Sequence, residues 1–283
     1  MADVRLRAHG LHLAATTYGD PGDPPVVLLH GGGQTRHAWG TAGQSFADEG
    51  WHALSVDLRG HGDSEWAPDG DYSMDAFAAD VTEVAGALRC PPLLVGASLG
   101  GLAALTAVGE SDDDGLALAL VLVDVTPRVE LEGRERIRAF MAGGMDGFAT
   151  LEDAADAISA FIPNRPRPAD LSGLRKNLRQ RDGRWYWHWD PAFIHGRSGV
   201  DGQPGMVDHD RLAAAARGVR IPVLLVRGRM SDIVSEEGVE ELRELVPHAE
   251  IVDVAGAGHM VAGDRNDAFN GAVLDFARRH AGG

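Results

Sequence analysis

A serine flanked by glycines stands where an apolar run meets a helix-forming run. The sequence there reads Leu93-Leu94-Val95-Gly96-Ala97-Ser98-Leu99-Gly100-Gly101. The pattern G-x-S-x-G at a strand-to-helix turn is typical of a nucleophile elbow, in which glycines leave room for a sharp, strained turn. We therefore predict that Ser98 is a nucleophile, and that the N–H of Leu99 stabilises developing negative charge at the helix N-terminus. A glycine-rich turn that merely contains a serine is the alternative.

A general base, and an acid that orients it, are needed before a serine hydroxyl can attack near neutral pH. His259 follows the apolar run at 251–254, and Asp232 follows the one at 222–226. Both side chains would lie at the carboxyl edge of a parallel sheet, in the chain order Ser, Asp, His. The sequence thus predicts a catalytic triad of Ser98, Asp232 and His259.

Asp124 is an alternative to Asp232 as the acid of the triad. It ends the apolar run at 118–123 and could approach the same histidine from the preceding strand. It could instead hydrogen-bond to the turn at Thr126-Pro127 and fix the entry to the next segment. Spacing alone leaves the choice between the two aspartates open.

The second half of an oxyanion hole is predicted in the loop His30-Gly31-Gly32-Gly33, which directly follows the apolar run at 26–29. Glycines let a backbone approach a bound acyl group without an intervening side chain. The N–H groups of Gly32 and Leu99 are therefore the two predicted oxyanion donors. A loop that serves only as a turn is the alternative interpretation.

Short apolar runs alternate with helix-like stretches over the first 124 residues. Strands are expected at 26–29, 53–56, 93–96, 118–123, 222–226 and 251–254, and helices at 74–88 and 266–280. This alternation predicts an α/β fold with a mostly parallel, doubly wound sheet covered by helices on both faces. Residues 5–18 alternate around His9-Gly10, which predicts an antiparallel hairpin at the start of the chain.

The alternation stops between 127 and 217. Helix-like segments lie there at 132–141, 151–161, 171–181 and 210–216, and a structureless loop of this length is improbable in a compact domain. We predict a hydrolase core in two parts, 1–126 and 218–283, with an inserted helical cap at 127–217. The aromatic segment at 184–193 is expected to anchor the cap to the core, with the lining of an apolar pocket as the alternative.

The composition of the chain disfavours several classes of function. The 283 residues include 26 basic and 42 acidic ones, a formal net charge of −16, which disfavours nucleic acid and anionic membranes as partners. No metal-ligand motif occurs, Cys90 is the single cysteine, and no cofactor is expected. The first residues lack a secretory signal pattern, so a cytoplasmic location is expected, with a small-molecule substrate as partner. The oligomeric state is left open.

Four separated motifs resemble the α/β-hydrolase-fold family. They are His30-Gly31-Gly32-Gly33, Asp57-Leu58-Arg59-Gly60-His61-Gly62-Asp63-Ser64, Gly96-Ala97-Ser98-Leu99-Gly100 and Gly256-Ala257-Gly258-His259, with 228–232 as a weaker fifth. The resemblance spans nearly the whole chain and implies a structural role for Asp57 and Arg59. Epoxide hydrolases and haloalkane dehalogenases of this fold have an aspartate at the elbow, where this chain has Ser98, so alkyl-enzyme chemistry is disfavoured.

These observations favour a serine hydrolase that cleaves a carboxylic ester or lactone of a small to medium, rather apolar molecule. A carbon–carbon bond hydrolase and a cofactor-free perhydrolase, or non-haem haloperoxidase, are alternatives because they can use the same triad. A non-catalytic ligand-binding protein on the hydrolase scaffold is the alternative from another class. Specificity depends on how the cap packs, so the sequence does not name the substrate.

Overall fold

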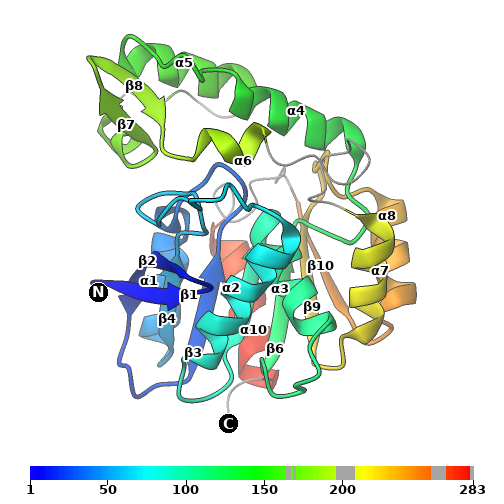
Figure 1. Cartoon of the computed structure of the whole chain (residues 1–283). Helices are drawn as coiled ribbons and strands as arrows, with labels where there is room; N and C mark the ends of the chain where they lie inside the picture. The colour runs from blue at the N-terminus through cyan, green and yellow to red at the C-terminus, as the bar shows by residue number, and fades with distance from the viewer. Residues whose placement is uncertain (163–166, 168–169, 196–207, 256–265, 281–283) are drawn as a thin grey trace.

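A mostly parallel sheet of eight strands forms the centre of the protein (Figure 1). The computed structural model describes residues 1–162, 167, 170–195, 208–255 and 266–280. The strands are β1 (Ala2–Ala8), β2 (Leu11–Tyr18), β3 (Pro25–Leu29), β4 (His52–Val56), β5 (Leu93–Ala97), β6 (Ala119–Val123), β9 (Val223–Gly228) and β10 (Glu250–Val254). Their order is β1-β2-β4-β3-β5-β6-β9-β10, and all neighbours from β4 to β10 are parallel. The predicted sheet is confirmed.

The predicted N-terminal hairpin is also present. Strands β1 and β2 pair antiparallel from Ala2 with Thr17 to Ala8 with Leu11. The two turn residues, His9 and Gly10, have φ values of +39° and +82°, which matches the tight turn that suits the twist of paired strands.

Helices cover both faces of the sheet. They are η1 (Arg36–Trp39), α1 (Gly40–Asp48), α2 (Met74–Gly86), α3 (Leu99–Gly109), α7 (His209–Gly218), α8 (Glu236–Leu245) and α10 (Asn266–His280). Helices α2, α3, α7 and α8 share one hydrophobic cluster, whereas α1 and α10 belong to a second cluster behind the sheet (Figure 1). Alternate residues of β3 serve the two clusters, Val27 and Leu29 the first and Val26 and Leu28 the second. This explains why the central strands are continuously apolar in sequence.

A separate layer lies across the carboxyl edge of the sheet (Figure 1). We call it the cap layer; its described elements are α4 (Leu131–Ala142), α5 (Leu151–Phe161), η2 (Ser172–Lys176), β7 (Leu178–Arg181), β8 (Arg184–Trp187) and α6 (Pro191–His195). The helix expected at 171–181 is wrong, because this stretch forms η2 and the first strand of a hairpin. Asp182 and Gly183 turn that hairpin with φ values of +49° and +75°, and this pair is a strong hairpin signal.

Helix α7 falls inside the predicted insert at 127–217 but packs on α3 of the core. A Cβ on Gly109 of α3 would lie 2.0 Å from the carbonyl oxygen of Ala215, so the two helix backbones touch. The division of the chain at 126 and 217 stays a prediction. The helices of the described residues are all too short or too polar to cross a membrane.

Candidate active site

Ser98 occupies a strained turn between β5 and α3. Its φ of +46° and ψ of −115° are rare for a residue with a side chain, and its N–H donates to the carbonyl oxygen of Val123 at 3.1 Å. Backbone strain of this kind costs about 1 to 3 kcal/mol and persists where the surrounding structure enforces it. The side chain is partly exposed at the carboxyl edge of the sheet. The elbow therefore has the form expected for a presented nucleophile.

Positions 96 and 100 of the elbow have room only for glycine. A Cβ on Gly96 would lie 2.5 Å from the carbonyl oxygen of Gly100, and a Cβ on Gly100 would lie 2.6 Å from that of Leu29. Real side chains do not approach backbone atoms this closely, so either alanine would force the turn apart. The spacing of the motif is thus set by contact between β3, β5 and the start of α3.

The glycine loop after β3 lies directly against this elbow. A Cβ on Gly31 would be 3.3 Å from Cβ of Ser98, and one on Gly32 would be 4.0 Å from the Leu99 side chain. The carbonyl oxygen of Gly31 accepts hydrogen bonds from the N–H of Gln34 (3.1 Å) and Nδ1 of His30 (2.8 Å). Because the trans peptide is planar, the N–H of Gly32 points away from that oxygen. The oxyanion role of Gly32 and Leu99 stays a prediction that this geometry fits.

Asp124 is the immediate neighbour of the nucleophile across the sheet. Ala97 of β5 pairs with Val123 of β6, so Ser98 and Asp124 are the next residues on adjacent parallel strands. The Asp124 carboxylate is fully buried, and its Oδ1 accepts from the N–H of Gly228 at 3.0 Å. Its Oδ2 accepts from the hydroxyl of Ser231 at 2.5 Å. The alternative role of Asp124, a hydrogen bond to the Thr126-Pro127 turn, stays a prediction.

Asp232 lies in the loop after β9 and faces the cap layer. Its Oδ2 accepts hydrogen bonds from Nε (2.9 Å) and Nη2 (2.5 Å) of Arg136 on α4, and its side chain is 42% exposed. Arg136 also donates to the carbonyl oxygen of Phe161 at the end of α5. Asp232 thus ties a core loop to two cap-layer helices. The third predicted triad member, His259, lies outside the described residues.

Three buried imidazoles, of His30, His61 and His188, form a contiguous group beside the glycine loop. The rings of His30 and His61 are 5.2 Å apart, and those of His61 and His188 are 5.8 Å apart. Burial lowers the pKa of each ring, and for His61 it lowers the pKa to about 3. Sequence reasoning missed this group; a signal for His188 was present, a histidine between two tryptophans in an aromatic segment.

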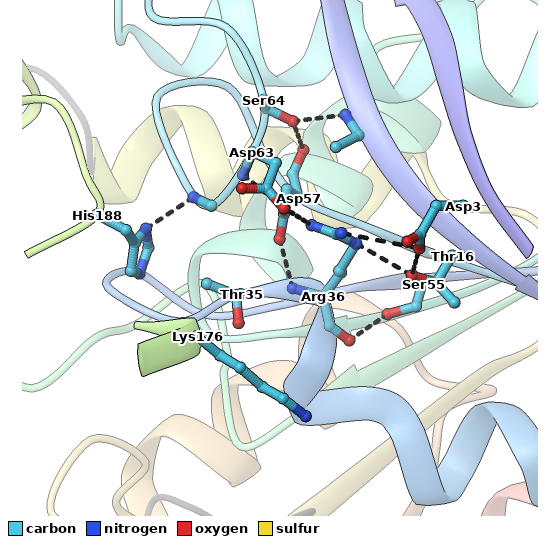
Figure 2. Close-up of polar contacts among 12 residues, drawn as sticks. Asp3, Thr16, Thr35, Arg36, Ser55, Asp57, Asp63, Ser64, Lys176 and His188 are labelled. Atoms are coloured by element: carbon cyan, nitrogen blue, oxygen red, sulfur yellow. Dashed lines mark hydrogen bonds and ion pairs between the residues drawn. The ribbon is translucent and has the colours of Figure 1, made fainter. Parts of the chain in front are cut away.

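The loop at 57–64 is held by buried ion pairs (Figure 2). Asp57 accepts from the backbone N–H of Arg36 at 2.6 Å and pairs with its guanidinium at 2.5 Å, and both residues are buried. Arg59 forms two hydrogen bonds, of 2.6 and 2.7 Å, with the carboxylate of Asp80. These contacts fit the structural role implied for Asp57 and Arg59.

A hollow of about 550 Å³ opens beside this loop, at the β1–β2 edge of the sheet. Arg36, Asp63 and Arg179 line it, and each of these charges already has an ionic partner: Asp63 pairs with both arginines. The hollow gives no reason to place a substrate there.

Comparison with known proteins fixes the family. Residues 24–265 match the family model described as the alpha/beta hydrolase fold. Esterase Rv0045c of Mycobacterium tuberculosis is 34% identical over 253 residues, covering 86% of this chain and 78% of that protein. N-formylmaleamate deformylase of Pseudomonas putida is 29% identical over 280 residues, covering 98% and 96%. The crystal structure of E-2-(acetamidomethylene)succinate hydrolase superposes with a TM-score of 0.85 at 25% identity, covering 97% of this chain and 98% of that one. The chain belongs to the α/β-hydrolase family and is a hydrolase.

Proposed function

We propose that this hydrolase cleaves a carboxylic ester or lactone of a small to medium, rather apolar molecule through an acyl-enzyme. The observation that carries the proposal is the strained turn of Ser98, presented beside a glycine loop that offers a backbone N–H. The neighbours of Ser98 fit what an acyl transfer needs: the N–H groups of Gly32 and Leu99 are the proposed oxyanion donors, and the carboxylate of Asp124 is buried beside them.

The proposed reaction begins when the Ser98 hydroxyl attacks the carbonyl carbon and His259 takes its proton. The N–H groups of Gly32 and Leu99 hold the negative oxygen of the tetrahedral intermediate. His259 then protonates the leaving alcohol, and the acyl group remains on Ser98. Water repeats the sequence and frees the acid.

For the acid that orients His259, Asp124 is the better candidate. It is buried, is fixed by two hydrogen bonds and follows the strand next to that of Ser98. The carboxylate of Asp232 is exposed, and Arg136 already occupies its Oδ2. A carboxylate in contact with a guanidinium stabilises an imidazolium less, because its charge is partly compensated. Asp232, predicted from chain order, is the alternative.

Apolar side chains around the glycine loop support an apolar acyl group. An ideal Cβ on Gly32 would meet Phe193 at 3.8 Å and Met141 at 3.9 Å, and one on Gly33 would meet Trp189 at 3.3 Å. The relatives carry names that include an esterase, a deformylase and a 3-hydroxybutyrate-oligomer hydrolase. A substrate panel should therefore contain p-nitrophenyl esters, lactones and N-acyl compounds.

The test of the proposal is loss of the hydroxyl. A fluorophosphonate probe should label the wild type, and Ser98→Ala should abolish labelling and lower kcat for p-nitrophenyl esters by about 10⁶-fold. Ser111→Ala, beyond the other end of α3, is the matched control and should keep both properties. Undiminished turnover in Ser98→Ala would exclude an acyl-enzyme on this residue.

A further inference from the structure

His188 joins the cap layer to two loops of the core. It lies between β8 and α6, and its ring is buried. Nδ1 accepts a hydrogen bond from the N–H of Gly62 at 2.7 Å (Figure 2), and Nε2 lies 3.3 Å from the carbonyl oxygen of Gly33. A backbone N–H can only donate, so Nδ1 must carry the lone pair. The neutral ring then has its proton on Nε2, which donates to Gly33.

The carbonyl of Gly33 is the second of two fixed oxygens that flank Gly32. The first, on Gly31, is held from the core by Nδ1 of His30 at 2.8 Å. The second is held from the cap layer by His188. Gly33 has a φ of +72° and no side chain, so its peptide is restricted by the hydrogen bond from His188 and by packing against Met141 and Trp189.

We propose that His188 is a positioning residue of the oxyanion hole: its neutral ring bridges Gly62 and Gly33 and thereby holds the Gly33 end of the glycine loop, so that Gly32, whose N–H direction is set by the Gly31 carbonyl, keeps its place beside the elbow. The inference rests on the proposed function, because it takes the Gly32 N–H as an oxyanion donor. It goes further in making a cap-layer side chain part of what shapes the core's catalytic loop. The loop is then complete only when the cap layer is seated.

The surroundings of His188 keep its ring in the form that this bridge needs. Burial and the adjacent rings of His61 and His30 hold the pKa of His188 well below its usual value. A protonated ring would direct an N–H from Nδ1 at the N–H of Gly62, and that contact is repulsive. The bridge therefore belongs to the neutral ring.

Two substitutions separate the two ends of the bridge. In His188→Asn, the side-chain oxygen can replace Nδ1 and keep the bond to Gly62, but nothing reaches Gly33. In His188→Gln, the amide nitrogen can replace Nε2 and keep the bond to Gly33. We expect His188→Asn to lower kcat by about 10 to 100-fold, the usual cost of a misplaced catalytic group, with KM within about threefold. His188→Gln should stay within about fivefold of the wild-type kcat.

Arg179→Met is the matched control for cap docking. Arg179, on β7, donates to the carbonyl oxygen of Gly62 at 2.7 Å and to Asp63 at 2.6 Å, but it does not contact the glycine loop. Its loss should change kcat by less than about threefold. The fluorophosphonate reaction also uses the oxyanion hole. The rate of labelling should therefore fall most in His188→Asn, less in His188→Gln and least in Arg179→Met.

The proposal would be overturned if His188→Gln lost more kcat than His188→Asn. If His188 only anchors the cap layer, His188→Asn keeps the shorter bond and should be the milder variant, or both variants should match Arg179→Met. If Ser98→Ala remains active, the proposed function fails as well; if it is inactive, a reversed order removes the role of His188 alone. Nitrogen-15 shifts of the wild-type ring add a test that needs no variant: a proton on Nε2 supports the bridge, and one on Nδ1 excludes it.

Discussion

Asp124 and Asp232 follow parallel strands at one edge of the sheet, yet their surroundings are opposite. Asp124 is fully buried and held by a backbone N–H and a hydroxyl. Asp232 is 42% exposed and held by a guanidinium from another layer. A buried carboxylate keeps one orientation and a strong field, whereas an exposed pair is weakened by water and salt.

The two loops therefore have different tasks at the carboxyl edge of the sheet. In the proposed mechanism, the turn after β6 supports the chemistry, because strand pairing places Asp124 next to Ser98. The loop after β9 supports the cap layer, because Arg136 contacts both Asp232 and the end of α5. Ser231 connects the two, since its hydroxyl donates to Asp124 while the next residue pairs with Arg136.

The largest effect is expected when the charge is removed from each aspartate in turn, which tests whether Asp124 or Asp232 is the acid of the triad. Asp124→Asn should lower kcat by about 10⁴-fold, the usual size for the acid of a triad. Asp232→Asn should change it by less than about tenfold. Steady-state kinetics with a p-nitrophenyl ester measure both, and thermal midpoints confirm folding. If Asp232→Asn shows the larger loss, the acid is Asp232 and the two loops do not have these tasks.

The stability of the protein should fall in mild acid because of the buried histidines beside the glycine loop. The folded pKa of His61 is lowered to about 3, below the value of about 6.5 expected when unfolded. The unfolded chain therefore binds more protons below pH 6.5, and stability is lost as pH falls from there toward 3. The slope should reach about 1.4 kcal/mol per pH unit for each such histidine. The pKa values of His30 and His188 are shifted the same way.

Urea unfolding between about pH 7 and pH 5.5 measures this slope before most carboxylates titrate. His61→Phe should reduce the slope of the unfolding free energy against pH by about the contribution of one histidine. Phenylalanine suits the site because Nε2 of His61 is buried without a hydrogen-bond partner among the described residues, and Phe193 packs on the ring at 4.7 Å. An unchanged slope in His61→Phe would show that this ring does not stay neutral in the folded protein.

The smallest effect is expected at the exposed pair. Arg136→Met should lower the free energy of unfolding by no more than about 1 kcal/mol, as is usual for exposed ion pairs. Raising NaCl from about 0.05 M to about 1 M should raise KM for a bulky ester in the wild type but not in the variant. Equal salt dependence in both proteins would mean that the pair does not hold the cap layer.

The sequence predicted those parts of the fold whose backbone geometry requires particular residue types. The strands, the hairpin at His9-Gly10 and the elbow at Ser98 each show a local pattern of residue types, although the backbone that requires Gly100 at the elbow is that of Leu29 in β3, far away along the chain. The hairpin of the cap layer was missed because helix-like composition outweighed the turn signal of Asp182-Gly183.

The acid could not be chosen from sequence, because spacing identifies strand ends but not which loop is buried. The surroundings of each aspartate come from residues about a hundred positions away along the chain: Gly228 and Ser231 hold the buried Asp124, and Arg136 pairs with the exposed Asp232. His188 was missed for a related reason. Its two partners, Gly62 and Gly33, are backbone atoms of distant loops, and no side-chain pattern encodes them.

The crowding around Gly96 and Gly100 has a consequence for redesign. Backbone atoms fill the space into which either residue could grow, whereas the side chain at position 98 projects into partly open surroundings. An engineer can therefore replace the hydroxyl of Ser98, the proposed nucleophile, by the thiol of Ser98→Cys without rebuilding the turn that holds it. Reshaping the turn itself would require moving β3, β5 and the start of α3 together.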